Sequence, residues 1–555
     1  MHRKEATLIR IARGDGFCKS SMTPYPAWQG AWRRCIAGLL LGLLGLMAGC
    51  TSLPQIDREG SFVTTAVPLS TQTTLGKIAQ TSLPSPELSG FRLMPLGSFS
   101  LDTRLQLARR AEATLDLQYY QFQDDETGRL LLRAIADAAR RGVRVRLLLD
   151  DFYTSGSDTL FLGLAAYPNV EVRLFNPFCC ARNTGQLTRF ALSVGDWSRV
   201  NHRMHNKLFI ADGAMAVIGG RNVANEYFTR SMAENFVDVD AFTVGFIVPP
   251  LQELFDRYWN SFSAYPLASI AKTELSQEQL LAQFDDRTGP LHTPPPAKLG
   301  PNDILGYGPI ADDLDEGRLG LVWGEAYVFA DYPDKPFESA AGDDPLETSV
   351  TYNVVAEIKK AKTEVVASSP YFVPGKRGMQ LLQSLRNRGV KLQVLTNSLA
   401  ATDEMIVHAG YSRYREDMLK MGVDLYELSS SRLKMNNRPF HFGSSLGRLH
   451  AKLVVIDKHL SFIGSMNLDP RSASVNTELG AIIESPALAK ELLNIIDIDR
   501  LQSAYRVRLS PQGYGLEWLG ADDEKEMILN TEPDSTTWMR LKLWLLGPLI
   551  PEELL

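Results

Sequence analysis

The sequence predicts an α/β protein made of two pseudo-symmetric halves, each a mixed sheet flanked by helices, with the active site at their interface. From about residue 91, strand-like apolar runs alternate with helical patterns, which is typical of α/β architecture. A strand–helix–strand unit occurs twice, and each copy is followed by the same motif of histidine, lysine and aspartate. The composition, with 45% apolar and 22% charged residues, is that of an ordinary globular protein.

The first 49 residues predict a secretory signal. Arg33 and Arg34 precede a short apolar run at 36–49 (IAGLLLGLLGLMAG), and Cys50 follows. A basic flank and a short apolar core are typical of a signal peptide, whereas a spanning helix needs about 20 apolar residues. The phrase LMAGC resembles a bacterial lipobox, so Cys50 is the expected lipidation site. An uncleaved signal anchor is the alternative, and Met22 is a second candidate start.

The remaining chain divides by composition. Residues 50–90, rich in Ser, Thr and Pro, are interpreted as the lipidated cysteine and a tether. The two halves are expected at 91–265 and 346–510, with a connecting insertion at 266–345. Residues 511–555 end in an apolar stretch that is too short to span a bilayer. A helix lying on a membrane and a helix packed on the body are equal alternatives for it.

An internal repeat supports the two halves. The first copy comprises a strand at Leu115–Tyr120, a helix at Arg129–Arg141 and a strand at Val143–Leu149, and the second a strand at Val365–Phe372, a helix at Gly378–Arg388 and a strand at Val390–Leu395. The phrase Arg-Gly-Val joins helix to strand in both copies. A repeat of this kind predicts a pseudo-two-fold site.

The motif His-x-Lys-x4-Asp-x6-Gly-[Gly/Ser]-x-Asn follows each copy without a gap. Its members are His205, Lys207, Asp212 and Asn222 in the first half and His450, Lys452, Asp457 and Asn467 in the second. Histidine and lysine two apart on a strand point to the same face. The aspartate ends that strand, and a second strand delivers the glycine and the asparagine.

These groups suit a phosphodiester. Lysine and asparagine bind non-bridging oxygens, so the predicted phosphate-binding residues are Lys207, Asn222, Lys452 and Asn467. One histidine attacks phosphorus and forms a phosphohistidine. The other protonates the leaving alcohol and then deprotonates the acceptor. No metal and no cofactor are expected, because the sequence holds no cysteine or histidine cluster with metal-ligand spacing.

The motifs resemble those of the phospholipase D superfamily. The phrases RMHNK, YFVP, LTNSLAATDE, VHAGY, DPRSAS and NTELG are similar to the bacterial cardiolipin synthase C type, and the resemblance runs from about residue 93 to 555. It implies two phospholipase D-like domains. The catalytic residues that it implies are His205, Lys207, Asp212, His450, Lys452 and Asp457, with His205 favoured as the nucleophile.

The resemblance also implies that an acid after each motif orients the histidine of that motif. Asp238 is the candidate in the first half, with Asp240 as an alternative, and Glu478 is the candidate in the second. Tyr120 and Tyr371 occupy equivalent repeat positions. Packing in the strand core is the favoured interpretation for both, and a position facing the cleft is the alternative.

The resemblance implies a phosphatidyltransferase that acts on phosphatidylglycerol, with phosphatidylethanolamine as a candidate donor. Hydrolysis of phospholipids stays open as an alternative. A nuclease and a nucleic-acid partner are disfavoured, because 64 acidic residues outnumber 58 basic ones and such a balance opposes binding to phosphate backbones. A lipid-binding lipoprotein with a decayed site is disfavoured by the intact motifs. The expected location is the periplasmic side of a bacterial envelope, with the choice of membrane and of any protein partner left open.

Overall fold

The repeated units have the same architecture in the computed structural model of the chain. The first comprises β2 (Thr114–Tyr119), α4 (Glu126–Arg140) and β3 (Arg144–Asp150), and the second β11 (Glu364–Ser368), α13 (Gly375–Asn387) and β12 (Lys391–Asn397). The two strands of each unit pair in parallel. Gly142 and Gly389, which follow the helices, have φ angles of 97° and 83°. Only glycine adopts this conformation without strain, which explains the repeated Arg-Gly-Val phrase.

The structure describes residues 53–58, 62–179, 182, 184–296, 298–335, 349–432, 445–513, 515–522, 525–547 and 550. The expected signal at 1–49 and the expected lipidation site Cys50 lie outside the described residues. Within the described part, no helix combines the length and the apolarity needed to cross a membrane.

The strands of the described chain form one continuous sheet of 18 strands and a separate two-stranded pair. The first half contributes, in spatial order, β9 (Ala264–Pro266), β4 (Val170–Phe175), β3, β2, β5 (Leu208–Ala211), β6 (Met215–Gly219), β8 (Asp240–Gly245) and β1 (Ser89–Met94). The second half contributes β10 (Val322–Ala330), β17 (Leu479–Glu484), β16 (Leu460–Gly464), β15 (Leu453–Ile456), β11, β12, β13 (Asp424–Leu428), β18 (Ala504–Leu509), β19 (Leu516–Asp522) and β20 (Lys525–Leu529).

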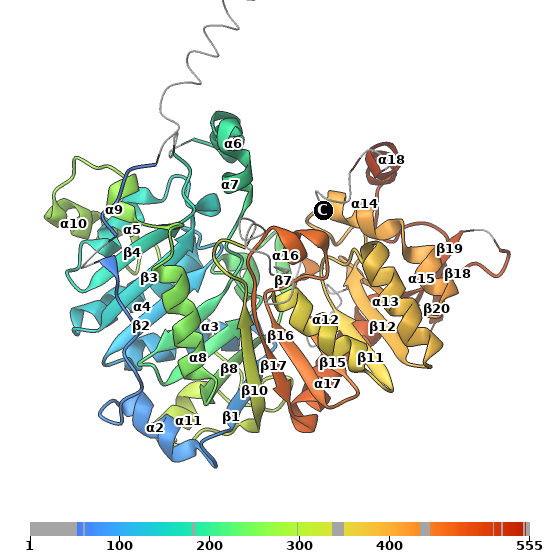
Figure 1. The fold of residues 1–555 in the computed structure, drawn as a ribbon, viewed down its shortest axis with the longest axis horizontal. Helices are drawn as coiled ribbons and strands as arrows, with labels where there is room; N and C mark the ends of the chain where they lie inside the picture. Colours follow the sequence, from blue (N-terminus) through green and yellow to red (C-terminus); the bar gives the residue numbers. More distant parts are fainter. Residues whose placement is uncertain are drawn as a thin grey trace, which may run out of the picture. The chain divides into compact units, whose positions relative to one another are not determined.

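The central strand orders of the two halves correspond, because β4-β3-β2-β5-β6-β8 matches β13-β12-β11-β15-β16-β17 (Figure 1). In each half, three strands pair in parallel and the others antiparallel. The prediction of two pseudo-symmetric α/β halves with mixed sheets is confirmed. Strand β10, which lies inside the expected connection at 266–345, pairs with β1 and β17 and thereby joins the halves.

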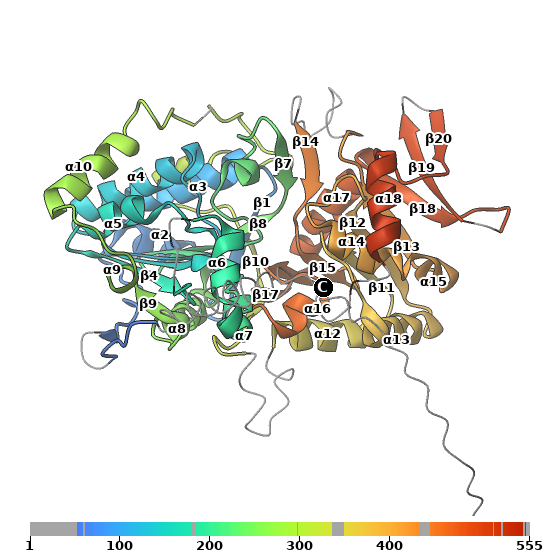
Figure 2. The same ribbon diagram turned by 90° about the horizontal axis from the view of Figure 1, so that it is seen from above.

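Helices cover both faces of the sheets (Figure 2). The remaining helices are α2 (Thr74–Ser82), α3 (Gly97–Arg110), α5 (Asp158–Ala165), α6 (Gln186–Leu192), α7 (Trp197–Asn201), α8 (Val248–Trp259), α9 (Leu267–Ile270), α10 (Gln277–Arg287), α11 (Ile310–Glu316), α12 (Val350–Lys360), α14 (Met405–Ser412), α15 (Arg415–Lys420), α16 (Pro470–Ser474), α17 (Pro486–Gln502) and α18 (Thr537–Leu546). Short 3₁₀ helices are η2 (Asp151–Tyr153), η3 (Val194–Asp196) and η4 (Asn225–Phe228).

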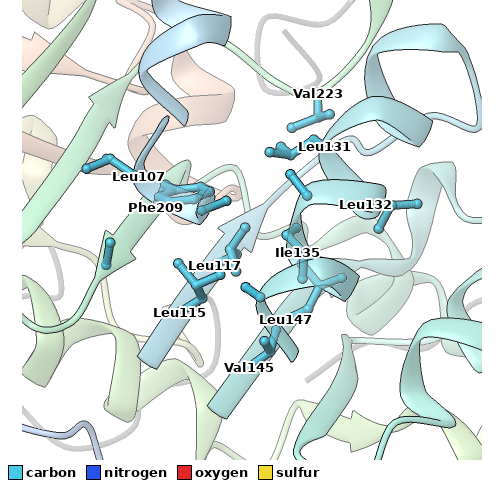
Figure 3. Close-up of a cluster of buried hydrophobic side chains, with 14 of the residues drawn as sticks. Leu107, Leu115, Leu117, Leu131, Leu132, Ile135, Val145, Leu147, Phe209 and Val223 are labelled. Atoms are coloured by element: carbon cyan, nitrogen blue, oxygen red, sulfur yellow. The ribbon is translucent and has the colours of Figure 1, made fainter. Parts of the chain in front are cut away.

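The motif strands β5 and β15 are apolar on both faces because each lies between two cores. Phe209 of β5 packs with Leu117 and Ile135 in the core under α3 and α4 (Figure 3). Leu208 and Ile210 point the other way, into a central core that side chains of both halves share. Alternate residues of a strand face opposite sides, and each buried leucine, isoleucine or phenylalanine contributes about 1.5–3 kcal/mol. The two motif strands are therefore fixed firmly in the sheet.

Candidate active site

The first motif begins in an extended segment just before β5, rather than within a strand as the spacing predicts. Met204 forms a parallel bridge with Thr477 of the other half. The amide of His205 donates to the carbonyl of Thr477 at 2.9 Å. The carboxylate of Asp150, at the carboxyl end of β3, accepts the amide of Met204 at 2.8 Å. Backbone contacts from both halves thus fix the position of His205.

The second motif repeats this arrangement. The strands β7 (Glu234–Val237) and β14 (Leu446–Leu449) pair in parallel across the halves. The amide of His450 then donates to the carbonyl of Val237 at 2.7 Å. At the carboxyl end of β12, the side chain of Asn397 makes hydrogen bonds of 2.8 and 2.9 Å to the backbone of Leu449. Asn397 therefore has the role that Asp150 has in the first half.

The orienting acids are exchanged between the halves. Nδ1 of His205 lies 2.9 Å from the carboxylate of Glu478, and Nδ1 of His450 lies 2.6 Å from that of Asp238. The prediction that each acid serves the histidine of its own motif is wrong. The physical reason is the backbone pairing between the halves. Glu478 directly follows Thr477, and Asp238 directly follows Val237. In each case the residue before the acid pairs with the opposite histidine.

The choice between Asp238 and Asp240 is also decided by these contacts. Asp240 is fully buried and forms an ion pair with Arg104 at 3.0 Å. It also accepts a hydrogen bond from Ser100 at 2.6 Å. Asp240 is therefore part of the packing of α3 on the sheet, and Asp238 is the acid that contacts a motif histidine.

Both motif aspartates lie away from the histidines, at the far ends of β5 and β15. The carboxylate of Asp212 accepts the amides of Glu112, Ala113 and Thr114 at 2.8–3.1 Å. Its φ angle of 51° is in the left-handed region. The four residues of β5 lie between Lys207 and Asp212, and five steps of extended chain span about 16 Å. The prediction of a catalytic role for Asp212 is therefore wrong, and this residue fixes the loop before β2.

Asp457 has the equivalent position in the second half. Its carboxylate accepts the amides of Lys362, Thr363 and Glu364 at 2.7–3.2 Å, and its φ angle is also 51°. The prediction of a catalytic role for Asp457 is wrong for the same reason. The aspartate belongs to the motif because it closes the loop that leads into the neighbouring strand.

The two motif lysines are buried beside their histidines. Nζ of Lys207 donates to the carbonyl of His205 at 2.6 Å, and Nζ of Lys452 donates to that of His450 at 2.6 Å. Each ammonium keeps further protons for other acceptors, because it carries three donors. The lysines are thus available to non-bridging phosphate oxygens next to either imidazole.

The two motif asparagines are both buried but have different contacts. Asn222 accepts the amide of Gln121 at 3.2 Å and donates to the hydroxyl of Tyr227 at 2.9 Å. Tyr227 in turn packs edge-on against His450, with ring centroids 5.0 Å apart. The side-chain oxygen of Asn467 is buried without a hydrogen-bond partner. Asn222 thus reaches the site through Tyr227.

Aromatic rings surround the two imidazoles. Tyr120 packs edge-on against His205 at 5.1 Å between centroids, and Nζ of Lys207 lies 5.3 Å from the same ring. Tyr227 and Phe236 both pack against His450 at 5.0 Å. The favoured interpretation of Tyr120 as a strand-core residue is wrong, because Tyr119 takes the core position and Tyr120 faces the site. The hydroxyl of Tyr371 donates to Asp403 at 2.8 Å.

The two halves of the chain match the same family profile. A family profile described as "Cardiolipin synthase, PLD-like domain" matches residues 105–259 and 354–500. Cardiolipin synthase C of Escherichia coli (strain K12) is 37% identical over 477 residues, which are 83% of this chain and 96% of the relative. The chain belongs to the cardiolipin synthase family. The resemblance to the phospholipase D superfamily and the prediction of a phosphatidyltransferase are thereby confirmed.

Two further comparisons extend over most of the chain. An uncharacterized protein of Helicobacter pylori (strain ATCC 700392 / 26695) is 30% identical over 474 residues, which are 84% of this chain and 90% of that protein. The phosphatidylserine synthase of Haemophilus influenzae Rd KW20 superposes with a TM-score of 0.53 and 12% identity. This match covers 87% of this chain and all of that one. At this identity the superposition shows the shared fold.

In this member of the cardiolipin synthase family, burial and positive charge lower the pKa of both histidines. Burial, together with the charges of Lys207 and Lys452, lowers the pKa of His205 to about 4, although Glu478 opposes the shift. Burial and the same two lysines lower the pKa of His450 well below 6.5. Both imidazoles are therefore neutral near pH 7. Because each lysine acts on both histidines, the two motifs form one electrostatic site.

The two orienting acids differ in their surroundings. Glu478 also accepts hydrogen bonds from Ser465 at 2.5 Å and Ser472 at 2.7 Å. Burial raises the pKa of Glu478, but the contact with His205, the charge of Lys207 and the hydrogen bond from Ser465 outweigh it, so the pKa is lowered. Burial raises the pKa of Asp238 more than Lys452 and Arg221 lower it. The two halves of this cardiolipin synthase family member have the same fold, but the carboxylates beside their histidines have opposite pKa shifts.

Some supporting residues lie outside the predicted set. Asp331 accepts the amide of Glu478 at 2.9 Å and forms an ion pair with Lys335 at 2.8 Å. Asp150 and Asn397 fix the residues before the two histidines. Asp150 stands in the phrase RVRLLLDD and Asn397 in VLTNS. A polar residue that directly follows a buried strand is the signal that marks both. Within the described residues, no group of three or more His, Cys, Asp or Glu side chains is arranged to hold a metal ion.

Proposed function

We propose that the protein transfers a phosphatidyl group onto phosphatidylglycerol through a phosphohistidine and so makes cardiolipin. The observation that carries this proposal is the pair of imidazoles, each held at Nδ1 by a carboxylate of the other half. Among the described residues, no group is hydrogen-bonded to their Nε2 atoms, which leaves these atoms for chemistry on a phosphodiester. The similarity to cardiolipin synthase C supports the choice of substrate class.

In the proposed first step, Nε2 of His205 attacks the phosphorus of the donor lipid. The bond from phosphorus to the head-group oxygen breaks, and its electron pair leaves with that oxygen. His450, in its protonated form, supplies the proton that makes the leaving group an alcohol. Lys207 and Lys452 offset the negative charge on the non-bridging oxygens. The donor phosphate also raises the pKa of His450, because its charge opposes that of the lysines.

In the second step, His450 takes a proton from a glycerol hydroxyl of phosphatidylglycerol. The hydroxyl oxygen attacks phosphorus, and the phosphorus–nitrogen bond breaks to return neutral His205. We propose phosphatidylethanolamine as a donor, in which case ethanolamine is released. Phosphatidylglycerol as donor would release glycerol by the same steps.

The surroundings of the two acids support His205 as the nucleophile. Glu478 has a lowered pKa and three hydrogen-bonding partners on its carboxylate. It therefore stays charged and stabilises the positive charge that develops on His205 during attack. Asp238 has a raised pKa, so the His450–Asp238 pair is better suited to gaining and losing a proton.

We also propose that the chain is a lipoprotein of the bacterial envelope, anchored at Cys50 on the periplasmic side. The lipobox-like phrase before Cys50 supports this location. An anchor would raise the effective concentration of the lipid substrates. Labelling of cells with an alkyne fatty acid tests it, because the wild type should carry the label and Cys50→Ser should not.

Expression in cells that lack cardiolipin tests the activity. Lipid extracts analysed by mass spectrometry should contain cardiolipin with the wild type and none with His205→Ala or His450→Ala. Phosphatidic acid in place of cardiolipin would make the protein a hydrolase. If both variants matched the wild type, the assignment of these histidines would be wrong.

A further inference from the structure

Helix α18 near the end of the chain exposes a face of large apolar side chains. Trp538 is 60% exposed and Trp544 71%, and Leu541 and Leu545 are exposed as well. Residues spaced three or four apart share one face of a helix. Helices at the surface of soluble proteins normally present polar residues there, so an exposed apolar strip marks an interaction site.

The fold fixes the direction of this face. Before α18, the carboxylate of Asp534 accepts hydrogen bonds from Ser429 at 2.5 Å and Ser431 at 2.8 Å. After it, the guanidinium of Arg413 donates to the carbonyls of Gly547 and Ile550. Polar contacts at both ends thus hold α18 against the second half. The apolar face points outward while its opposite side faces α14.

A second group of exposed apolar residues lies on the first half. Trp197, at the start of α7, is 50% exposed, and Leu192 at the end of α6 is also exposed. Phe190 connects them to the body, because its ring lies 5.6 Å from that of Trp197 and 5.5 Å from that of Phe152. On the second half, Ile406 is exposed on α14, the helix that contacts α18. Each half therefore carries an apolar ridge.

Both ridges lie at the edge of the sheets that carries the histidines. Helices α6 and α7 follow the carboxyl end of β4, and α14 follows that of β12. His205 comes four residues after α7. Between the ridges, α16 carries Ser472, which contacts Glu478. Figure 1 shows α6 and α18 at the same upper edge of the molecule, with α16 between them. A flat surface that touched both ridges would cover the edge of the sheets at which the histidines lie.

The charges on α18 indicate what kind of surface this is. The helix TWMRLKLWLL contains Arg540 and Lys542 and no acidic residue, although the whole chain has a net charge of −6. Nζ of Lys542 lies 5.4 Å from the ring of Trp538. Tryptophan prefers the boundary between lipid tails and head groups, and neighbouring cations attract anionic lipids. Apolar residues rimmed by positive charge match an anionic bilayer.

We propose that the ridge of α18 and Ile406 and the ridge of Leu192 and Trp197 dock the protein on an anionic phospholipid bilayer, with the active site facing the lipid head groups. The proposal rests on the proposed function for its lipid substrate. Docking brings the head-group phosphate of a lipid to the histidines without extracting its acyl chains. This contact is separate from any anchor on Cys50, because it sets the orientation of the site toward the membrane.

Tryptophan fluorescence tests the contact directly, whether or not the protein is lipid-anchored. The full chain is mixed with vesicles of equal parts phosphatidylglycerol and phosphatidylethanolamine, some with bromine on the acyl chains. Brominated lipids should quench the wild type, and most of the quenching should be lost in the Trp538→Phe/Trp544→Phe variant. Absence of quenching in the wild type would overturn the proposal. The proposal would also be overturned if light scattering showed wild-type dimers, the α18 variants were monomeric, and brominated lipids still quenched the variants. The face of α18 would then bind a second copy of the chain.

Activity distinguishes failed docking from failed chemistry. In Trp538→Ser/Trp544→Ser we expect activity on vesicles to fall roughly tenfold or more, while activity on a short-chain lipid dispersed as monomers stays unchanged. The phenylalanine pair keeps an apolar face and should retain vesicle activity. Leu291→Ser, at an exposed apolar residue outside both ridges, is the matched control. Equal losses on vesicles and monomers would overturn the docking role. A wild type that is quenched but inactive on both would contradict the proposed function alone.

Discussion

The carboxylate of Glu478 lies 2.9 Å from Nδ1 of His205, a residue 273 positions earlier in the chain. Asp238 makes the reciprocal contact with His450 across 212 positions. Each imidazole thus takes its orientation from the opposite half. The two contacts can be tested separately, because the two histidines are proposed to do different steps.

Glu478→Gln should impair the formation of the phosphohistidine. The amide keeps the shape of the acid but removes the charge that stabilises His205 during attack. We expect a loss of roughly 10²–10⁴-fold in kcat. The measurement uses a phosphatidyl ester of p-nitrophenol, whose leaving group needs no proton.

With this substrate, Asp238→Asn should still release p-nitrophenol in the first turnover at a rate close to that of the wild type, since this step needs no proton for the leaving group. Later turnovers should be slower, because His450 must also take a proton from the acceptor. With natural lipids, the same variant should be strongly impaired. If Glu478→Gln released p-nitrophenol rapidly and Asp238→Asn did not, the roles of His205 and His450 would have to be exchanged.

Asp212→Ala and Asp457→Ala should lower stability and spare catalysis. Each removes the acceptor of three backbone amides and places alanine at a positive φ. We expect about 1–3 kcal/mol of lost stability for each. Thermal unfolding measures this loss, and kcat of the folded fraction should stay within a few-fold of the wild type. A loss of kcat comparable to that of His205→Ala would restore the catalytic assignment.

The stabilising effect of Asp457 should also depend on pH. Burial raises its pKa, but the hydrogen bonds from Thr363, Glu364 and Lys362 together outweigh burial and lower it to about 2. Because this folded-state pKa lies below the ordinary value of 3.8, the contribution is present above pH 4. It is lost as the pH falls toward 2. The stability difference between wild type and Asp457→Asn should therefore shrink over that interval in chemical denaturation, and a constant difference would contradict this account.

The alkaline limit of activity should reflect the motif lysines. Burial lowers the pKa of Lys452 to about 8 and that of Lys207 well below 10.5. Both ammonium groups must be charged to bind the phosphodiester, so kcat/KM should fall as the pH rises through about 8. The bound phosphate raises these pKa values, so kcat should fall only at higher pH. In Lys452→Arg the remaining activity should persist to higher pH, since a guanidinium keeps its proton. A kcat/KM profile that is flat to pH 10 would contradict this prediction.

Gly220 and Ser465 occupy equivalent motif positions but should respond differently to alanine. A Cβ on Gly220 would lie 2.4 Å from a carboxylate oxygen of Asp238, which is buried and bonded to His450. Gly220→Ala should therefore displace Asp238 and reduce kcat by at least about tenfold. Ser465→Ala removes one hydrogen bond from Glu478 and leaves Ser472 in place, so a smaller loss is expected. Steady-state kinetics on natural lipids compares the two. Equal effects would show that the close contact at Gly220 has no consequence for catalysis.

Much of this fold could be predicted because the signals are local. The strand, helix and glycine patterns of each unit lie within about 30 residues. They therefore predicted the strand–helix–strand units that contain β2 and β11, with small errors at the ends of the elements. The strand expected to reach Phe372 ends at Ser368, because Pro370 cannot donate to a neighbouring strand. The pairing of β10 with β1 joins segments more than 200 residues apart, and no local pattern specifies such a partner.

The site shows the same division between local and distant information. The motif spacing identified His205 and Lys207, since neighbours in sequence stay neighbours in space. The same spacing included Asp212, and the resemblance implied a catalytic role for it, but the rise of the strand carries it about 16 Å away from the lysine. The exchange of Glu478 and Asp238 depends on the register between the halves, which a single sequence does not contain. Tyr119 and Tyr120 are adjacent aromatic residues, and which of them faces the core depends on a register that composition does not reveal.

The backbone contacts of His205 with Thr477 and of His450 with Val237 also bear on the order in which the enzyme becomes active. During synthesis, the first half leaves the ribosome before the second half. At that stage His205 and Lys207 are present, but the carboxylate that orients the imidazole and the second histidine that protonates the leaving group are not. Neither reaction with a lipid nor attack by water can proceed efficiently at this stage. The site is therefore complete only when the two halves pair, and activity of the protein reports that this pairing has formed.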